Sequence, residues 1–221
     1  MAVESLHFAA VPVPLKELLF ELMSDPLIDA FSLVGGTALA LTFGHRRSID
    51  IDLFTSESFD AERMAEMLEA KYPLEGIVTA KNTLNGSIRG IKLDLISHRY
   101  RLIDRSAMIE GIRMLGLKDL AAMKLNAIAN RGSRKDFWDF AELLEHWSVG
   151  ELLRCYREKY PHTNIWQVQK SLCYFDDAEI EPEPEILKKS TWEEVKATIR
   201  SNCLLSGEGN GSRTETPSDG I

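Results

Sequence analysis

The sequence has 221 residues, 44% of them hydrophobic and 27% charged, which is ordinary for a soluble globular protein of one large domain or two small ones. Its 26 Lys and Arg against 34 Asp and Glu give a formal net charge of −8, which argues against a general nucleic-acid binder. Much of this charge is local, because the segment 176–185 carries −6 and the tail 206–221 carries −2. The rest of the chain is neutral overall, so a basic surface on it is not excluded.

The cysteines and the N-terminus indicate a cytoplasmic protein. Cys155, Cys173 and Cys203 are widely spaced and form no CxxC or Cys/His motif, so we expect neither a disulfide framework nor a zinc site. The N-terminal segment has an acidic residue at position 4 and no basic region, unlike a signal peptide. No apolar run approaches the roughly 18 residues of a membrane span, so we expect no membrane partner.

The first half of the chain alternates predicted helices and strands. Apolar residues at helical spacing predict a helix over 14–23. A short apolar strand over 31–34 is followed at once by two glycines and a helix-prone ALALTF, and IDIDLF (49–54) alternates as a strand with one polar face. The remaining elements of this half are a helix over 59–72, strands over 77–81 and 87–97 around an Asn85-Gly86 turn, and a strand over 112–115.

From residue 117 the pattern becomes helical. Segments separated by Gly, Ser or Pro predict helices over 117–130, 133–147, 149–160, 163–175 and about 191–202. The Gly-, Ser- and Thr-rich residues 206–221 predict a disordered tail. We therefore expect an α+β protein with an α/β core over 1–116, a helical domain over 117–205 and the tail.

A glycine pair and three aspartates in the first half indicate phosphate chemistry. Gly35-Gly36 lies between a strand and a helix, where the backbone can approach a phosphate and the helix N–H groups can bind it. Asp50 and Asp52 are two apart on a strand, so they would point to one side about 6–7 Å apart, and Asp94 lies in a later strand. Carboxylate oxygens so placed suit Mg²⁺, and a third would let two ions clamp a phosphoryl displacement.

Each of these features also has a purely structural explanation. A glycine pair before a helix is often only a tight turn, and alternating aspartates often form a solvated face. Asp94 could lie on the exposed side of an edge strand. In the functional interpretation, Thr37 could add a hydroxyl donor. The order and spacing together favour metal binding: a glycine pair, a helix-length gap, D-x-D and a later strand aspartate form the signature of the nucleotidyltransferase fold.

A second cluster lies in the helical half. Lys124 shares a helical face with apolar residues, so its ammonium either reaches solvent along that face or meets an anion such as a nucleotide phosphate. Ser133 and Asp136 fit a helix N-cap and a first-turn acid, which stabilise a helix start whatever the function. Asp139 follows one turn later and could pair with Lys135. On local physics alone, a structural role for Asp136 is favoured.

Together these residues resemble the AbiEii/AbiGii toxin family of nucleotidyltransferases, a branch of the polymerase-beta-like superfamily. The resemblance covers the chain to about residue 203, through VGGTALALTFGHRRSIDIDLF (34–54), IKLDLIS (91–97), LKDLAAMKLNAIANRGSRKDFWDF (117–140) and LCYFDDAE (172–179). GHRRSIDID matches the family's G-x-x-x-S-x-D-x-D motif, and the Lys…R-K-D-x-x-D pattern is similarly distinctive. The resemblance implies a mixed sheet with flanking helices and a C-terminal helical region.

The resemblance also implies roles for the residues of these motifs. Asp50 and Asp52 would bind Mg²⁺, with Asp94 as the further metal ligand. Lys124 would contact the nucleotide, and Asp136 would act at the transfer step, as a base or as the orienter of the acceptor hydroxyl. The expected catalytic residues are thus Asp50, Asp52, Lys124 and Asp136, and the expected nucleotide-binding residues are Gly35, Gly36, Thr37, Ser48 and Lys124.

The implied reaction transfers a nucleoside monophosphate from an NTP to an acceptor, with loss of pyrophosphate. In relatives the acceptor can be the 3′ end of tRNA, which makes the enzyme a toxin or phage-defence component, and a winged-helix antitoxin is the usual partner. Basic residues that flank the motifs would suit RNA. They are His45, Arg46, Arg47, His98, Arg99, Arg101, Arg131, Arg134 and Lys135.

Two departures from the family pattern bear on the acceptor. Met123 stands where relatives often carry an acidic residue, and the chain is short for the family. One alternative keeps the chemistry and transfers to a protein hydroxyl or to a small molecule such as an aminoglycoside. The other is a non-catalytic nucleotide-binding regulator, whose mark would be a broken acidic triad; the triad here is intact.

Overall fold

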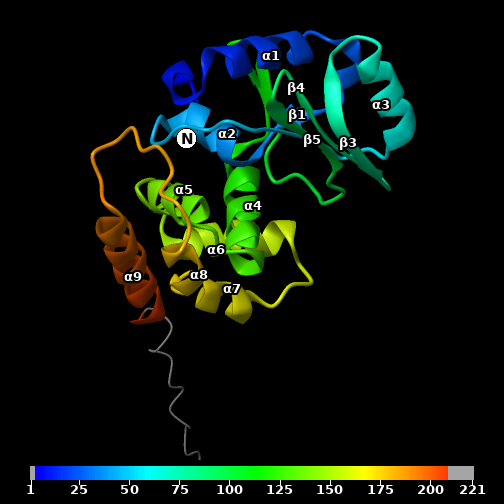
Figure 1. Ribbon diagram of the computed structural model, residues 1–221. Helices are drawn as coiled ribbons and strands as arrows, with labels where there is room; N and C mark the ends of the chain where they lie inside the picture. Colours follow the sequence, from blue (N-terminus) through cyan, green and yellow to red (C-terminus); the bar gives the residue numbers. More distant parts are fainter. Residues whose placement is uncertain (1–2, 209–221) are drawn as a thin grey trace, which may run out of the picture.

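A mixed seven-stranded sheet forms the N-terminal half of the protein in the computed structural model, which describes residues 3–208 (Figure 1). The strand order is β3-β4-β5-β2-β1-β7-β6, in which β2 runs parallel to β5 and β1 runs parallel to β7. The predicted α+β class is confirmed. The strands are β1 (Ser32–Leu33), β2 (Ile51–Thr55), β3 (Leu74–Ala80), β4 (Thr83–Ile88), β5 (Ile91–Ser97), β6 (Ala107–Ile109) and β7 (Ile112–Met114).

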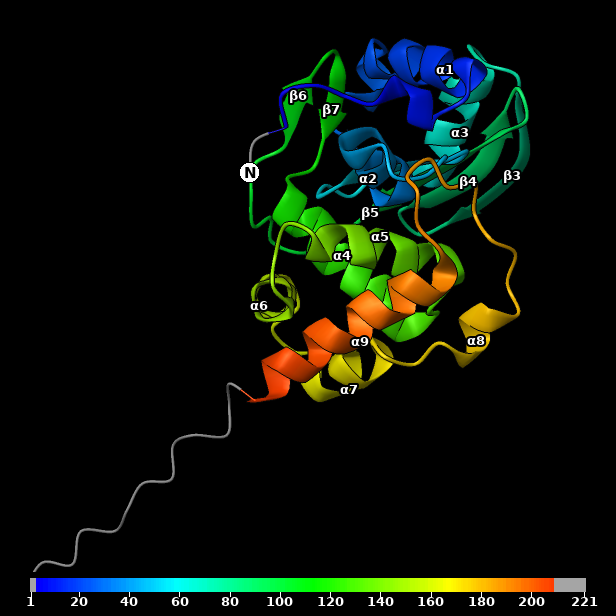
Figure 2. The same ribbon diagram turned by 90° about the vertical axis from the view of Figure 1, so that its left-hand side faces the viewer.

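Helices α1 and α3 accompany the sheet, and a helical bundle makes up the second half (Figures 1 and 2). Helix α2 follows β1 directly and packs against both α4 and α5, which brings the two halves of the chain together. The helices are η1 (Phe8–Ala10), α1 (Val13–Met23), η2 (Pro26–Ile28), α2 (Gly35–Phe43), α3 (Ala61–Glu69), α4 (Leu117–Asn130), α5 (Arg134–Leu144), α6 (Val149–Lys159), α7 (Ile165–Ser171), α8 (Asp176–Glu179) and α9 (Trp192–Glu208).

The alternation of side chains along β2 and β5 decides which residues face the helical half. Ile51 and Leu53 of β2 are fully buried in the apolar core, as are Leu93 and Leu95 of β5. Because successive side chains of a strand point to opposite faces, Asp52 lies on the other face of the sheet. The buried apolar side chains on one face of each strand thus fix the position of the polar side chains on its other face.

The predicted hairpin turn at Asn85-Gly86 is wrong. Both residues lie inside β4, and the chain turns instead at Asn82 and at Arg89-Gly90, where φ is positive at all three residues. Gly86 has a packing reason, because a Cβ there would lie 3.1 Å from Leu74 Cδ1 and 3.2 Å from the Glu75 carbonyl oxygen, beside an irregularity in β3. Strand β6 and helix α8 were not predicted.

Helix α9 runs through Glu208 and so extends into the segment predicted as a tail. The rest of that prediction, residues 209–221, lies outside the described residues. Within the described part of the chain, no helix is long and apolar enough to cross a membrane.

Candidate active site

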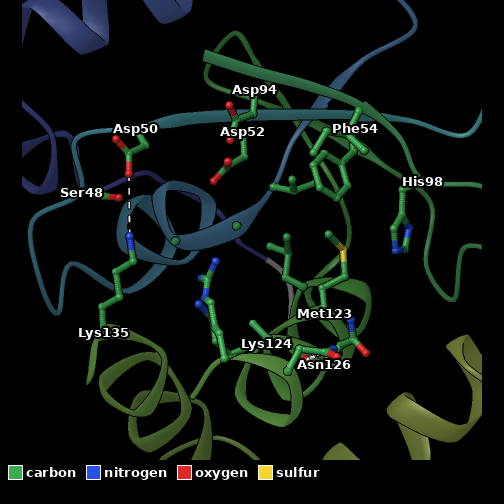
Figure 3. Close-up of a pocket in the computed structure, with 18 of the residues that line it drawn as sticks. Ser48, Asp50, Asp52, Phe54, Asp94, His98, Met123, Lys124, Asn126 and Lys135 are labelled. Carbon is green, nitrogen blue, oxygen red and sulfur yellow. Dashed lines mark hydrogen bonds and ion pairs between the residues drawn. The ribbon is translucent and has the colours of Figure 1, made fainter. Parts of the chain in front are cut away.

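A cavity of about 450 Å³ lies between the sheet and helix α4, a size typical of small-molecule sites (Figure 3). The start of α2 and strands β2 and β5 line one side, and α4 lines the other. The cavity brings together most of the residues predicted from the sequence: Gly35, Gly36, Ser48, Asp50, Asp52, Asp94 and Lys124.

Asp52 and Asp94 are direct neighbours, because β2 and β5 pair in parallel with these two residues in register. Asp94 accepts hydrogen bonds from Asn85 Nδ2 at 2.7 Å and from Lys92 Nζ at 2.5 Å. Burial raises the pKa of Asp52, and the negative charge of Asp94 raises it further. The fold therefore holds two carboxylates close together against their electrostatic repulsion, and the Lys92 ammonium offsets part of that repulsion.

Asp50 directly precedes β2, so strand alternation does not fix the direction of its side chain. Its carboxylate is 3.8 Å from the Lys135 ammonium at the start of α5 (Figure 3). Among residues 3–208, no three His, Cys, Asp or Glu side chains form a group that could hold a metal ion. The three predicted aspartates line one cavity, but only Asp52 and Asp94 are paired directly across the sheet.

The two glycines at the start of α2 are required by close contacts. Gly35 has a φ of +69°, and a Cβ there would lie 2.4 Å from Asp52 Oδ2. A Cβ on Gly36 would lie 2.4 Å from Arg46 Nη2. The interpretation of this pair as only a tight turn is therefore insufficient, because each glycine makes room for a charged side chain of the cavity.

We expect Gly35→Ala to lose the nucleotidyl transfer that the motif resemblance implies, because the new methyl group would displace the Asp52 carboxylate. Gly90→Ala is the matched control, since Gly90 also has a positive φ of +76° but nothing within 4 Å of its Cβ position. Both variants should lose about 1–2 kcal/mol of stability from left-handed backbone strain. Urea denaturation and a transfer assay on both variants check this prediction. Equal losses of activity in Gly35→Ala and Gly90→Ala would contradict it.

The hydroxyl of Thr37 does not face the cavity. It is buried and contacts the Ser48 hydroxyl at 2.8 Å and the Asp50 carbonyl oxygen. Ser48 does line the cavity. Thr37 therefore ties the Ser48–Asp50 segment to α2, and the expectation that its hydroxyl adds a donor to the site is not met.

Lys124, which lines the cavity, forms a buried ion pair with Asp136. Lys124 Nζ is 2.8 Å from Asp136 Oδ1, and Asp136 also accepts hydrogen bonds from Arg131 and from the Ser133 hydroxyl. Burial lowers the pKa of Lys124, but Asp139 and Asp136 outweigh it and leave that pKa raised. Burial raises the pKa of Asp136, yet Lys124 and Arg131 hold that pKa far below its ordinary value. Ser133 makes no side-chain cap on α5, so the capping explanation for this pair is incomplete.

Asp139 joins three basic side chains in the interior, a role that was not predicted from the sequence. It is fully buried and contacts Lys124 Nζ at 2.6 Å, His45 Nε2 at 2.7 Å and both Nε and Nη2 of Arg46. The possible pairing of Asp139 with Lys135 is not found, because Lys135 faces Asp50. The place of Asp139 in the R-K-D-x-x-D pattern was the available signal.

The basic residues just before β2 do not form a solvated phosphate-facing cluster. His45 and Arg46 are each only 3% exposed and are held by Asp139. Arg47 pairs with Glu185 at 2.9 Å, so part of the acidic segment neutralises this cluster. Of these three residues, only Arg46 lines the cavity, where its guanidinium lies directly against Gly36.

The far end of the cavity is aromatic and uncharged. The Phe54 and His98 rings stack with centroids 5.5 Å apart, and Figure 3 shows Phe54 between Asp52 and His98. His98 Nε2 is 3.1 Å from the Tyr160 hydroxyl. Burial lowers the pKa of His98 to about 4, and Lys159 contributes, so the imidazole is neutral at pH 7. The cavity thus has a charged end and a neutral, stacking end.

Comparisons with known proteins agree with this geometry. The family model for the nucleotidyl transferase AbiEii toxin of type IV toxin–antitoxin systems matches residues 17–203. An uncharacterized protein of Aquifex aeolicus (strain VF5) is 35% identical over 187 residues, which cover 82% of this chain and 90% of that protein.

Solved structures share the fold at low sequence identity. JHP933 from Helicobacter pylori aligns with a TM-score of 0.54 and 17% identity, over 88% of this chain and 89% of its own. MenT4, a nucleotidyltransferase toxin from Mycobacterium tuberculosis H37Rv, aligns with a TM-score of 0.53 and 12% identity, over 89% of this chain and 82% of its own. The described sheet and helices therefore form a nucleotidyltransferase fold.

Proposed function

Since the chain belongs to the AbiEii family of nucleotidyltransferase toxins and is itself a nucleotidyltransferase, we propose that it transfers a nucleoside monophosphate from an NTP to RNA, with the 3′ end of tRNA as the acceptor. The observation that carries the proposal is the cavity in which the Asp52–Asp94 pair lies against the glycine start of α2. Pyrophosphate is the leaving group. The bond formed joins the α-phosphorus to the acceptor hydroxyl oxygen, and the bond broken joins it to the β-phosphate.

The two ends of the cavity suit the two ends of an NTP. The backbone N–H groups at the start of α2 and the side chains of Lys135 and Arg131 offer positive charge to the triphosphate. Phe54 and His98 offer a stacking surface to the base, and the neutral imidazole costs little to cover. We therefore place the triphosphate at the charged end and the base at the aromatic end.

Asp52 and Asp94, with Asp50 as a third candidate, fit the requirements of Mg²⁺. Mg²⁺ is commonly bound by one or two carboxylates together with substrate phosphates and water, so a set of three protein ligands is not needed. Burial and the neighbouring Asp94 already disfavour a charged Asp52, and a divalent cation would relieve this repulsion. When bound, Mg²⁺ would neutralise charge on the triphosphate and on the attacking oxygen.

Asp136 is better suited to holding cations than to accepting a proton. Lys124 and Arg131 keep its pKa far below the ordinary range, so it is a weak base at neutral pH. Its contacts hold Lys124 and Arg131 in place, and both of these cations line the cavity. We assign Asp136 a positioning role, in which it acts on the reaction through these two cations.

The acceptor is tested by following label from each of the four NTPs, labelled at the α-phosphate, into a mixture of total RNA and cell protein. We expect label in RNA of tRNA size. Label confined to protein, or to an added aminoglycoside, would refute the RNA acceptor while keeping the chemistry. NTP binding without any labelled product would instead support the non-catalytic regulator.

The family also suggests the biological setting. We propose that the protein acts in the cytoplasm as the toxin of a type IV toxin–antitoxin pair, with a winged-helix antitoxin as its partner. Expression of the protein alone should slow growth, and co-expression of such an antitoxin from a neighbouring gene should restore it. Unimpaired growth at verified expression would argue against the toxin role.

A further inference from the structure

The loop 98–106 carries an aromatic path from the cavity to the surface. His98 lines the cavity, and its ring centroid is 4.8 Å from that of Tyr100, which is 49% exposed. Tyr160 packs edge-on against both rings, with centroids at 5.9 Å and 4.7 Å. Tyr100 is thus an exposed ring supported from below by two others.

The same loop carries arginines whose charges stay unpaired within residues 3–208. The side chains of Arg99, Arg101 and Arg105 are exposed and make no ion pair within the described part of the chain. By contrast, Arg47 pairs with Glu185, and Arg131 pairs with Asp136. The loop therefore presents positive charge that the protein itself does not neutralise.

A fully buried ion pair fixes the backbone of this loop. Asp119 of α4 and Lys159 of α6 are 2.6 Å apart with no exposed side-chain surface. Asp119 also accepts hydrogen bonds from the backbone N–H groups of Ile103 and Asp104, and Lys159 donates to the Arg101 carbonyl oxygen. Because the loop is held in place before any partner binds, little ordering cost remains for binding.

We propose that the loop 98–106 binds the single-stranded end of the RNA acceptor, with a base stacked on Tyr100 and the backbone phosphates held by Arg99 and Arg101. An exposed aromatic ring beside unpaired arginines is the combination that binds single-stranded nucleic acid without sequence preference. The aromatic path leads from this surface to the cavity that holds the NTP, so a bound strand approaches the cavity from its aromatic end. The inference rests on the proposed function, because it takes RNA as the acceptor.

Binding of a fluorescein-labelled 12-nucleotide RNA to the full chain, followed by fluorescence anisotropy without NTP, tests the loop independently of catalysis. We expect Tyr100→Ala to raise the Kd about tenfold and Tyr100→Phe to restore it, because stacking needs the ring alone. Arg99→Ala with Arg101→Ala should reduce the log Kd against log salt slope by about 1.4, since each phosphate contact on a single strand contributes about 0.7.

Trp166→Ala is the matched control. Trp166 lies on α7, is 59% exposed and has the Lys170 ammonium 3.5 Å from its ring centroid, so it offers the same chemistry away from the cavity. We expect this variant to bind RNA as the wild type does. Equal losses in Trp166→Ala and Tyr100→Ala, or no RNA binding by the wild type, would overturn the proposal.

A transfer assay separates failure of the loop from failure of the proposed function. If the wild type labels RNA and Tyr100→Ala raises KM for RNA with kcat and NTP binding unchanged, the loop is the acceptor surface. If the wild type labels RNA and Tyr100→Ala behaves identically, the loop proposal fails and the proposed function stands. If the wild type labels only protein, the RNA acceptor fails, and the anisotropy result decides on the loop alone.

Discussion

Asp52→Asn is expected to reduce nucleotidyl transfer by more than about 100-fold while raising the stability of the protein at pH 7. Substitution of residues that only support a metal ligand already costs about 10–100-fold, so loss of a ligand itself should cost more. Burial and Asp94 raise the pKa of Asp52, which means that its ionised form is unfavourable in the folded protein. Asparagine keeps the shape of the side chain and removes the charge, so activity and stability should move in opposite directions.

The measurement pairs a transfer assay in Mg²⁺ with urea denaturation in EDTA. Asp177→Asn is the matched control, since Asp177 is an exposed aspartate in the first turn of α8, away from the cavity. It should leave activity unchanged. A stable Asp52→Asn protein with wild-type transfer would refute the site, and an unstable one would refute the proposed repulsion between Asp52 and Asp94.

Asp139→Asn is expected to lower the free energy of unfolding by about 3–5 kcal/mol, the usual cost of leaving a buried charge unpaired. Its carboxylate is fully buried and pairs with both Arg46 and Lys124, and a neutral amide cannot replace it against two cations. Burial raises the pKa of Asp139, but Arg46 and Lys124 hold that pKa well below 3.8. The stabilisation is therefore complete above the ordinary carboxyl pKa and fades as the pH falls towards the lowered value.

Urea denaturation of wild type and variant at several pH values checks this prediction. The difference between the two proteins should be largest near neutral pH and should shrink below about pH 4. Glu145→Gln serves as the control, because Glu145 is an exposed acid at the C-terminal end of the same helix. If Asp139→Asn lowers the free energy of unfolding no more than Glu145→Gln does, the ion pairs of Asp139 with Arg46 and Lys124 do not stabilise the fold.

The acidic side of the site was predictable because it follows from local pattern. Alternation in IDIDLF and IKLDLIS separates Asp52 and Asp94 from the apolar residues of the same strands, and this holds in the structure. Their pairing in register could not be predicted from local pattern, because it depends on the strand order of the sheet. In that order β5 lies beside β2, although two strands separate them in the chain. Asp50 lies just outside its strand, where alternation no longer applies.

The errors arose where a distant residue decides the outcome. In the sequence Arg46 belongs to a basic cluster that would suit RNA, but in the structure it is buried and held by Asp139, which lies 93 residues away in sequence. Asn85-Gly86 reads as a turn, but the close approach of β3 requires the glycine inside a strand. Local pattern identifies residue types and periods, whereas ion-pair partners across the fold depend on tertiary packing.

The mass of the RNA 3′-terminal fragment, measured after incubation with a single NTP and Mg²⁺, tests the central claim most directly. The account predicts that wild-type protein adds the mass of one or more nucleoside monophosphates to that fragment and that Asp52→Asn adds none. An unchanged fragment, with the nucleotide recovered on protein or on a small molecule, would contradict it.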